Sequence, residues 1–173
     1  GELDPTVING GIINQYGTNA KIGSGSWLVA EADESDGSFT RLPAAIAVVT
    51  NIDPEHMDHY ETEDRLYRAF DRFVAQVPFY GFAVICIDDP KCQELIARTQ
   101  DKRLVTYGFS PQADVRGMRL KQDEGGMCFE VRIDRRGQTP RHIDKLRLPT
   151  LGEHNVSNSL AAIAIAAELG MSD

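Results

Sequence analysis

The chain has 173 residues, which suffices for one domain of ordinary size, and its 42% hydrophobic content is enough to form a core. Its formal net charge of −8 does not suit general binding to nucleic acid or to an anionic membrane. No apolar run approaches the ~18 residues of a membrane span, and the amino end lacks a secretory pattern. The three cysteines are widely spaced, which indicates no disulfide framework. We therefore expect one cytoplasmic domain that binds neither nucleic acid nor membrane.

The first two thirds of the chain alternate between predicted strands and helices. Apolar runs at 6–13, 27–30 and 45–52 come first, and an amphipathic helix at 61–77, a strand at 82–87, a helix at 91–99 and a strand at 104–107 follow. The helix at 61–77 places Leu66, Phe70 and Phe73 on one stripe and turns its arginines mostly away, with Thr62 as its cap. The nearly continuous hydrophobicity of the strands is typical of a parallel sheet that is covered on both faces. We therefore predict an α/β fold with a mostly parallel sheet flanked by helices.

The last third predicts antiparallel strands and then a buried helix. Apolar residues alternate on both sides of the glycines at 125–126, which predicts a hairpin over 114–134, and a turn at 135–137 leads to a strand near 145–148. The helix at 159–169 is apolar on nearly every face, so we expect it to lie against the sheet and to end at Gly170. The hairpin is expected to be an addition to the parallel core.

Two of the predicted strands each end in a polar cluster. Glu31 opens the acidic loop 31–36, and His56 lies in the acidic turn 51–59. Ligands of open α/β sheets bind beyond the carboxyl ends of the strands, so these two clusters can converge on one ion. Mg²⁺ prefers hard oxygen ligands and keeps several waters, which makes Glu31 a candidate metal ligand and His56 a candidate contact to metal or phosphate. The alternatives are a solvated acidic loop and a hydrogen-bonded structural histidine.

Two asparagines precede the last predicted helix. Asn155 and Asn158 are three residues apart, so they share one face of a first helical turn. Their amides can read the donor and acceptor pattern of a purine, and a helix start tolerates nearby anionic groups. The alternative is a simple helix cap.

Other features point away from a complete nucleotide site. No G-x-x-x-x-G-K-S/T loop occurs, so the chain by itself is expected to hold nucleotide poorly. Arginines of the hairpin region offer a second possible phosphate patch, although we favour a solvated face; they are Arg132, Arg135, Arg136 and Arg141.

Four segments resemble, in this order, the central ATPase domain of the Mur ligases. They are 31–39, 50–60, 77–81 and 152–158, and the resemblance runs over essentially the whole chain. It implies a P-loop-NTPase-like domain over 1–173 that lacks its P-loop segment and is truncated at both ends. It also implies a part of an ATP-dependent amide ligase of peptidoglycan synthesis. Among the members, the motifs are most similar to those that join L-alanine to UDP-N-acetylmuramate through an acyl phosphate.

The resemblance assigns roles to the four candidate residues. Glu31 and His56 would be catalytic residues that contact Mg²⁺, and Asn155 and Asn158 would contact the adenine of ATP. Several relatives use a carbamylated lysine for a second metal, but no lysine occurs between His56 and Lys91. Because the P-loop and the flanking domains of the family lie outside the chain, we expect the chain alone to be inactive and to self-associate through an unpaired sheet edge.

Three other functions stay open from the sequence. The first is a sister ligase that recycles murein tripeptide onto the same nucleotide sugar, because it shares the acidic loop. The second is a non-catalytic binding module that keeps the fold without the P-loop. The third is a metal-dependent phosphohydrolase, which is the least favoured because no nucleophile is evident.

Overall fold

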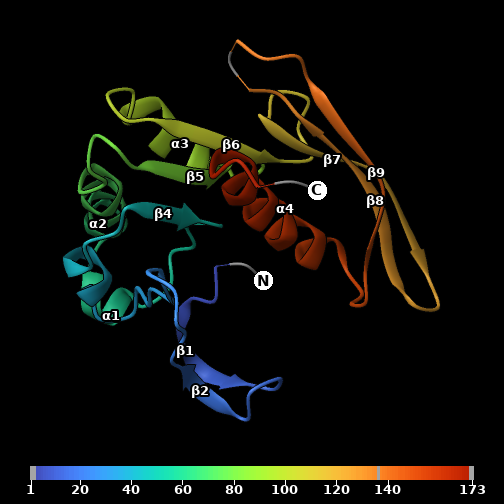
Figure 1. The fold of residues 1–173 in the computed structure, drawn as a ribbon. Helices are drawn as coiled ribbons and strands as arrows, with labels where there is room; N and C mark the ends of the chain where they lie inside the picture. Colours follow the sequence, from blue (N-terminus) through green and yellow to red (C-terminus); the bar gives the residue numbers. More distant parts are fainter. Residues whose placement is uncertain (1–2, 136, 172–173) are drawn as a thin grey trace.

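A computed structural model describes residues 3–135 and 137–171, and two separate sheets organise them (Figure 1). The larger sheet has the order β4 (Ile46–Val49), β5 (Phe82–Cys86), β6 (Leu104–Gly108), β7 (Val115–Asp123), β8 (Gly126–Ile133) and β9 (Arg141–Leu148). Its strands are parallel from β4 to β7 and antiparallel from β7 to β9. The smaller sheet has the order β2 (Thr18–Lys21), β1 (Thr6–Ile13) and β3 (Leu28–Ala30). The predicted α/β class and the added hairpin are confirmed.

Helices cover both faces of the larger sheet. The helices α2 (Glu63–Ala75) and α3 (Pro90–Arg98) lie on one face, and α4 (Glu153–Glu168) lies on the other (Figure 1). The strand β5 is buried at every residue and serves both layers: Ala83 and Ile85 belong to the core under α2 and α3, whereas Phe82, Val84 and Cys86 belong to the core under α4. This alternation follows from the two-residue repeat of a strand.

Local signals in the sequence begin α2 and α3. The Thr62 hydroxyl accepts a hydrogen bond from the Arg65 backbone N–H at 3.3 Å, which caps α2 as predicted. The Asp89 carboxylate accepts one from the Cys92 N–H at 2.7 Å, and Pro90 occupies the first turn of α3. Both caps satisfy N–H groups that a helix start leaves without partners.

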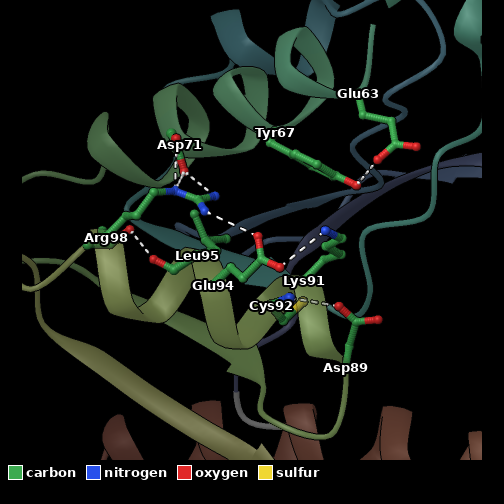
Figure 2. Close-up of polar contacts among 10 residues, drawn as sticks. Glu63, Tyr67, Asp71, Asp89, Lys91, Cys92, Glu94, Leu95 and Arg98 are labelled. Carbon is green, nitrogen blue, oxygen red and sulfur yellow. Dashed lines mark hydrogen bonds and ion pairs between the residues drawn. The ribbon is translucent and has the colours of Figure 1, made fainter.

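Polar side chains connect α2 to α3 on the outer side of the layer (Figure 2). Arg98 donates to the Asp71 carboxylate at 3.0 and 3.1 Å and lies 3.7 Å from the Glu94 carboxylate. The Lys91 ammonium lies 3.1 Å from Glu94 and 4.7 Å from the ring centre of Tyr67. These groups are largely exposed, so they orient the two helices and contribute little stability.

The prediction that the runs at 6–13 and 27–30 are buried strands of the main sheet was wrong. They form β1 and β3 of the smaller sheet, and neither strand contributes to the two hydrophobic cores of the described residues. Ile12 is 71% exposed and Leu28 is 59% exposed. A short apolar run looks the same in sequence whether or not its faces are covered, so periodicity alone could not reveal this.

The last helix begins earlier than predicted. The helix α4 starts at Glu153, so the stretch that was expected to precede it forms its first two turns. Gly170, with φ +74°, ends it as predicted, and its N–H donates to the Ala167 carbonyl at 3.1 Å. No helix among residues 3–135 and 137–171 has the length and apolar character that crossing a membrane requires.

Candidate functional site

The smaller sheet fixes the position of Glu31. This residue follows β3, and its backbone N–H donates to the Ile8 carbonyl of β1 at 2.9 Å. Its side-chain Oε2 accepts a hydrogen bond from the Gly10 N–H at 2.6 Å, and a Cβ at Gly10 would lie 3.0 Å from that oxygen. The side chain is exposed, and its Oε1 has no hydrogen bond to any residue in the described ranges. One carboxylate oxygen is therefore held in place while the other remains available to a cation.

The acidic loop is stabilised by its own serines. The Asp33 carboxylate accepts from the Ser35 N–H at 2.8 Å, and Asp36 accepts from the Ser38 N–H at the same distance. These hydrogen bonds lower the pKa of both carboxyl groups, and the charge of nearby His56 lowers that of Asp33 further. The loop is consequently anionic at neutral pH and lies beside the histidine turn.

A buried phenylalanine anchors the acidic loop to the core. Phe39 lies in the short helix η1 (Ser38–Arg41) directly after the loop and is only 2% exposed. Its ring centre lies 5.2 Å from that of Phe70 and 5.2 Å from that of Phe73, both in α2. The loop therefore cannot move without disturbing the core under α2.

The histidine turn packs against the acidic loop. His56 has left-handed backbone dihedral angles, with φ 55°, and begins the short helix α1 (Met57–Tyr60) after β4. The buried Tyr60 donates its hydroxyl to the Glu34 carbonyl. Gly37 has φ +71°, a left-handed conformation that favours glycine, and a Cβ there would lie 2.9 Å from His59 Nε2, so the loop and the turn approach closely. The two polar clusters that the sequence singled out are thus brought side by side.

Within the described residues, the polar clusters offer few protein ligands to a metal. Across 3–135 and 137–171, no group of three or more His, Cys, Asp or Glu side chains is arranged to hold a metal. The sequence-based prediction of Glu31 and His56 as metal contacts therefore involves no more than two protein ligands. Mg²⁺ commonly takes one or two protein ligands and completes its octahedron with waters and phosphate oxygens.

The two asparagines lie on α4 rather than ahead of it. The Asn155 amide Nδ2 donates to the Leu151 carbonyl at 2.8 Å, which helps to close the helix start, and the side-chain oxygen accepts no hydrogen bond from the described residues. Asn158 is exposed one turn later. Their separation of three residues places both on one face of the helix.

The arginines of the hairpin region have structural partners. Arg132 pairs with Asp134 at 2.7 Å, and Arg135 pairs with the buried Glu168 carboxylate at 3.1 Å. Arg136 lies outside the described residues, and Arg141 makes an interaction of its own. These pairs favour the structural interpretation of this region over a phosphate patch.

Sequence reasoning missed a basic cavity next to the acidic loop. Its volume is about 660 Å³, and its wall includes Arg41, Arg65, Arg68 and Arg72. The spacing of the last three along α2 is visible in the sequence, but it predicts only the outward face of an amphipathic helix. No signal within α2 distinguishes them from solvated arginines, because the cavity forms only where the segment 36–41 packs beside this helix.

Together, the helix layers and the adjoining acidic and histidine clusters define an α/β domain with polar loops after β3 of the smaller sheet and β4 of the larger sheet. A family model for the Mur ligase middle domain matches residues 24–166. The chain belongs to this family, and the resemblance noted from the four segments is confirmed.

The relatives agree with this assignment. The chain is 60% identical to a UDP-N-acetylmuramate--L-alanine ligase of Granulibacter bethesdensis and 59% identical to one of Gluconobacter oxydans, covering 99% of this chain and 36% of each relative. It thus spans about a third of the length of these relatives. A UDP-N-acetylmuramate-alanine ligase structure from Thermotoga maritima has a TM-score of 0.75 at 25% identity and covers 99% of this chain and 36% of that chain.

A second solved structure shows the same fold at lower identity. The UDP-N-acetylmuramate:L-alanyl-gamma-D-glutamyl-meso-diaminopimelate ligase of Neisseria meningitides has a TM-score of 0.81 at 22% identity, covering 98% of this chain and 54% of that one. The fold alone therefore does not separate the alanine ligase from the tripeptide ligase.

Proposed function

We propose that the chain is the metal- and ATP-binding part of a cytoplasmic ligase that joins L-alanine to UDP-N-acetylmuramate. The observation that carries the proposal is the packing of the acidic loop against the histidine turn, where Tyr60 donates to the Glu34 carbonyl. The identity of 60% to a ligase with this activity in its name supports the choice of substrates.

In the proposed reaction, the carboxylate of UDP-N-acetylmuramate takes the γ-phosphoryl group of ATP and ADP leaves. The amine of L-alanine then attacks the resulting acyl phosphate, an amide bond forms, and phosphate leaves with the loss of a proton from the amine. A bound Mg²⁺ supplies charge neutralisation on the phosphate oxygens, which is a large part of catalysis in phosphoryl transfer. The chain's own residues contribute positioning.

Each candidate residue has one task in this proposal. Glu31, held by the Gly10 N–H, presents a carboxylate oxygen to the metal. His56, at the end of the turn after β4, contacts the metal from the second cluster. Asn155 and Asn158 present side-chain amides from one face of α4 to the adenine.

The metal role is tested with Glu31→Gln in the intact protein that carries this chain. We expect the Mg²⁺ concentration for half-maximal activity to rise or kcat to fall by about 10- to 100-fold, as for other metal contacts. Glu124→Gln is the matched control, because Glu124 is exposed at the β7 to β8 turn and the same charge is removed. Equal activity of the two variants would contradict the assignment of Glu31.

The same assay decides between substrates. ADP release that needs both UDP-N-acetylmuramate and L-alanine supports the alanine ligase, whereas preference for murein tripeptide over L-alanine supports the recycling ligase. Phosphate release without an amine acceptor would indicate a phosphohydrolase, and no turnover with any acceptor would indicate a binding module.

The adenine role is tested with Asn158→Ala. We expect the KM for ATP to rise by up to about tenfold and the preference for ATP over GTP to weaken, because one side-chain hydrogen bond contributes about 0.5–1.5 kcal/mol. Asn14→Ala, in the exposed turn between β1 and β2, is the control. An unchanged ATP to GTP preference in Asn158→Ala would remove this residue from the adenine site.

A further inference from the structure

The basic cavity beside the acidic loop concentrates positive charge in an acidic protein. Three of its arginines, Arg65, Arg68 and Arg72, come from α2, and Arg41 comes from η1. Residues spaced three and four apart share one face of a helix, so the guanidinium groups face the same space of about 660 Å³. The whole chain carries a formal net charge of −8, so this concentration runs against the composition.

Three of these arginines have no polar partner among the residues that the structure describes. Arg65 pairs with the Glu61 carboxylate at 2.5 Å. By contrast, Arg41, Arg68 and Arg72 make no hydrogen bond or ion pair with any residue in the described ranges. Most other described cations have such a partner, as Arg98 has in Asp71 and Arg147 has in Asp123.

Clustering unpaired cations on one helix face is unfavourable without a counter-charge. Like charges four residues apart destabilise a helix, and Arg68 and Arg72 have this spacing. Among the described residues, the cavity wall holds a single carboxylate, Asp36, which already accepts a hydrogen bond from the Ser38 N–H. An anionic ligand would relieve the repulsion among the guanidinium groups.

Phosphate groups match this geometry best. A guanidinium presents a planar fork of N–H donors that pairs with two oxygens of a phosphate, and several forks can share one tetrahedral group or a diphosphate. A carboxylate offers two oxygens, whereas a phosphate group offers three or four, so a phosphate can accept from more guanidinium groups at once.

We propose that this cavity binds a phosphate-bearing ligand through Arg41, Arg68 and Arg72. Neither the proposed metal contacts nor the proposed adenine contacts include these residues. Binding there requires neither a metal nor ATP, so it is separate from the proposed contact of Mg²⁺ with Glu31. The phosphate can come from free inorganic phosphate or pyrophosphate, or from the diphosphate of a nucleotide sugar.

The test is calorimetric titration of the intact protein with pyrophosphate in a phosphate-free buffer of low ionic strength that contains EDTA. The variant Arg68→Gln/Arg72→Gln is expected to bind at least about tenfold more weakly than the wild type, because each lost charge-assisted bond weakens binding severalfold or more. The control is Lys121→Gln/Lys145→Gln, which removes the same charge from exposed, unpaired lysines of β7 and β9. Pyrophosphate binding that is equal in the two double variants would overturn the proposal.

A second variant controls for the possibility that the double substitution unfolds α2. Arg41→Gln lies outside that helix and is also expected to weaken pyrophosphate binding, with an unchanged circular dichroism spectrum. Normal binding by Arg41→Gln together with normal binding by the double variant would overturn the proposal independently of helix stability.

Two further experiments distinguish the possible sources of the phosphate and distinguish this proposal from the proposed contact of Mg²⁺ with Glu31. Competition between pyrophosphate and UDP-N-acetylmuramate assigns the cavity to the nucleotide sugar, whereas binding of both without competition assigns it to a free phosphate compound. Glu31→Gln is expected to bind pyrophosphate in EDTA as the wild type does. A failure of the magnesium proposal therefore leaves this result unchanged, and a failure here leaves the Glu31 test unchanged.

Discussion

Replacing Phe39 tests whether the acidic loop depends on the core under α2. Phe39→Ala removes a ring that is 2% exposed and lies 5.2 Å from two other rings. Buried Phe→Ala substitutions cost about 3–5 kcal/mol, since they lose transfer free energy and leave a cavity. We expect a loss of about 4 kcal/mol, a large fraction of the roughly 5–15 kcal/mol that stabilises an ordinary domain.

The assay is urea unfolding followed by circular dichroism, with the midpoint and the slope fitted separately. Phe79→Ala is the matched control, because Phe79 is 98% exposed and its loss is expected to change the free energy of unfolding by less than about 0.5 kcal/mol. Phe39→Leu keeps an apolar side chain and is expected to cost less than Phe39→Ala. A loss below about 1 kcal/mol for Phe39→Ala, with an unchanged slope, would refute the anchoring of the loop.

Three further outcomes are expected. Asp89→Ala removes the cap of α3 and should lower the free energy of unfolding by about 1 kcal/mol, whereas Asp89→Asn should retain most of it, as urea midpoints will show. Burial raises the pKa of the Cys92 thiol, so iodoacetamide at about pH 8.5 should modify the partly exposed Cys128 first, and early labelling of Cys92 in mass spectra would contradict this. The free energy of unfolding should fall as the pH rises above the ordinary thiol pKa, because only the unfolded chain then ionises Cys92. Arg98→Ala should cost less than about 1 kcal/mol, and the loss should shrink in about 1 M NaCl, so a salt-independent loss would argue against an ionic contribution.

The sequence predicted elements whose signals are local. The cap at Thr62 lies at the start of α2, and the turn that contains Gly125 joins β7 to β8 as expected. In each case the residues that determine the structure are within a few positions of each other, so no tertiary information was needed.

The predictions that failed depended on contacts between distant segments. Leu28 was expected to be buried because its neighbours are apolar, but covering a strand requires another element, and its sequence does not specify one. The start of α4 was placed late because asparagine, histidine and serine are modest helix formers, whereas burial of Val156 against the sheet stabilises the helix there.

The candidate site was predictable only where its signals are local in the sequence. Strand ends identified Glu31 and His56 as members of polar clusters, and the structure brings the two clusters together through Tyr60 and Gly37. The role of Arg68 and Arg72 was not predictable, because an outward arginine on an amphipathic helix is normally solvated and only the adjoining loop reveals the cavity.

The strand β5 supplies side chains to the cores on both faces of the larger sheet. Neither layer can therefore melt by itself without exposing one face of this shared strand. We expect the amide protons of β5 to be among the slowest to exchange with deuterated solvent, and probes placed under α2 and under α4 to report a single cooperative transition.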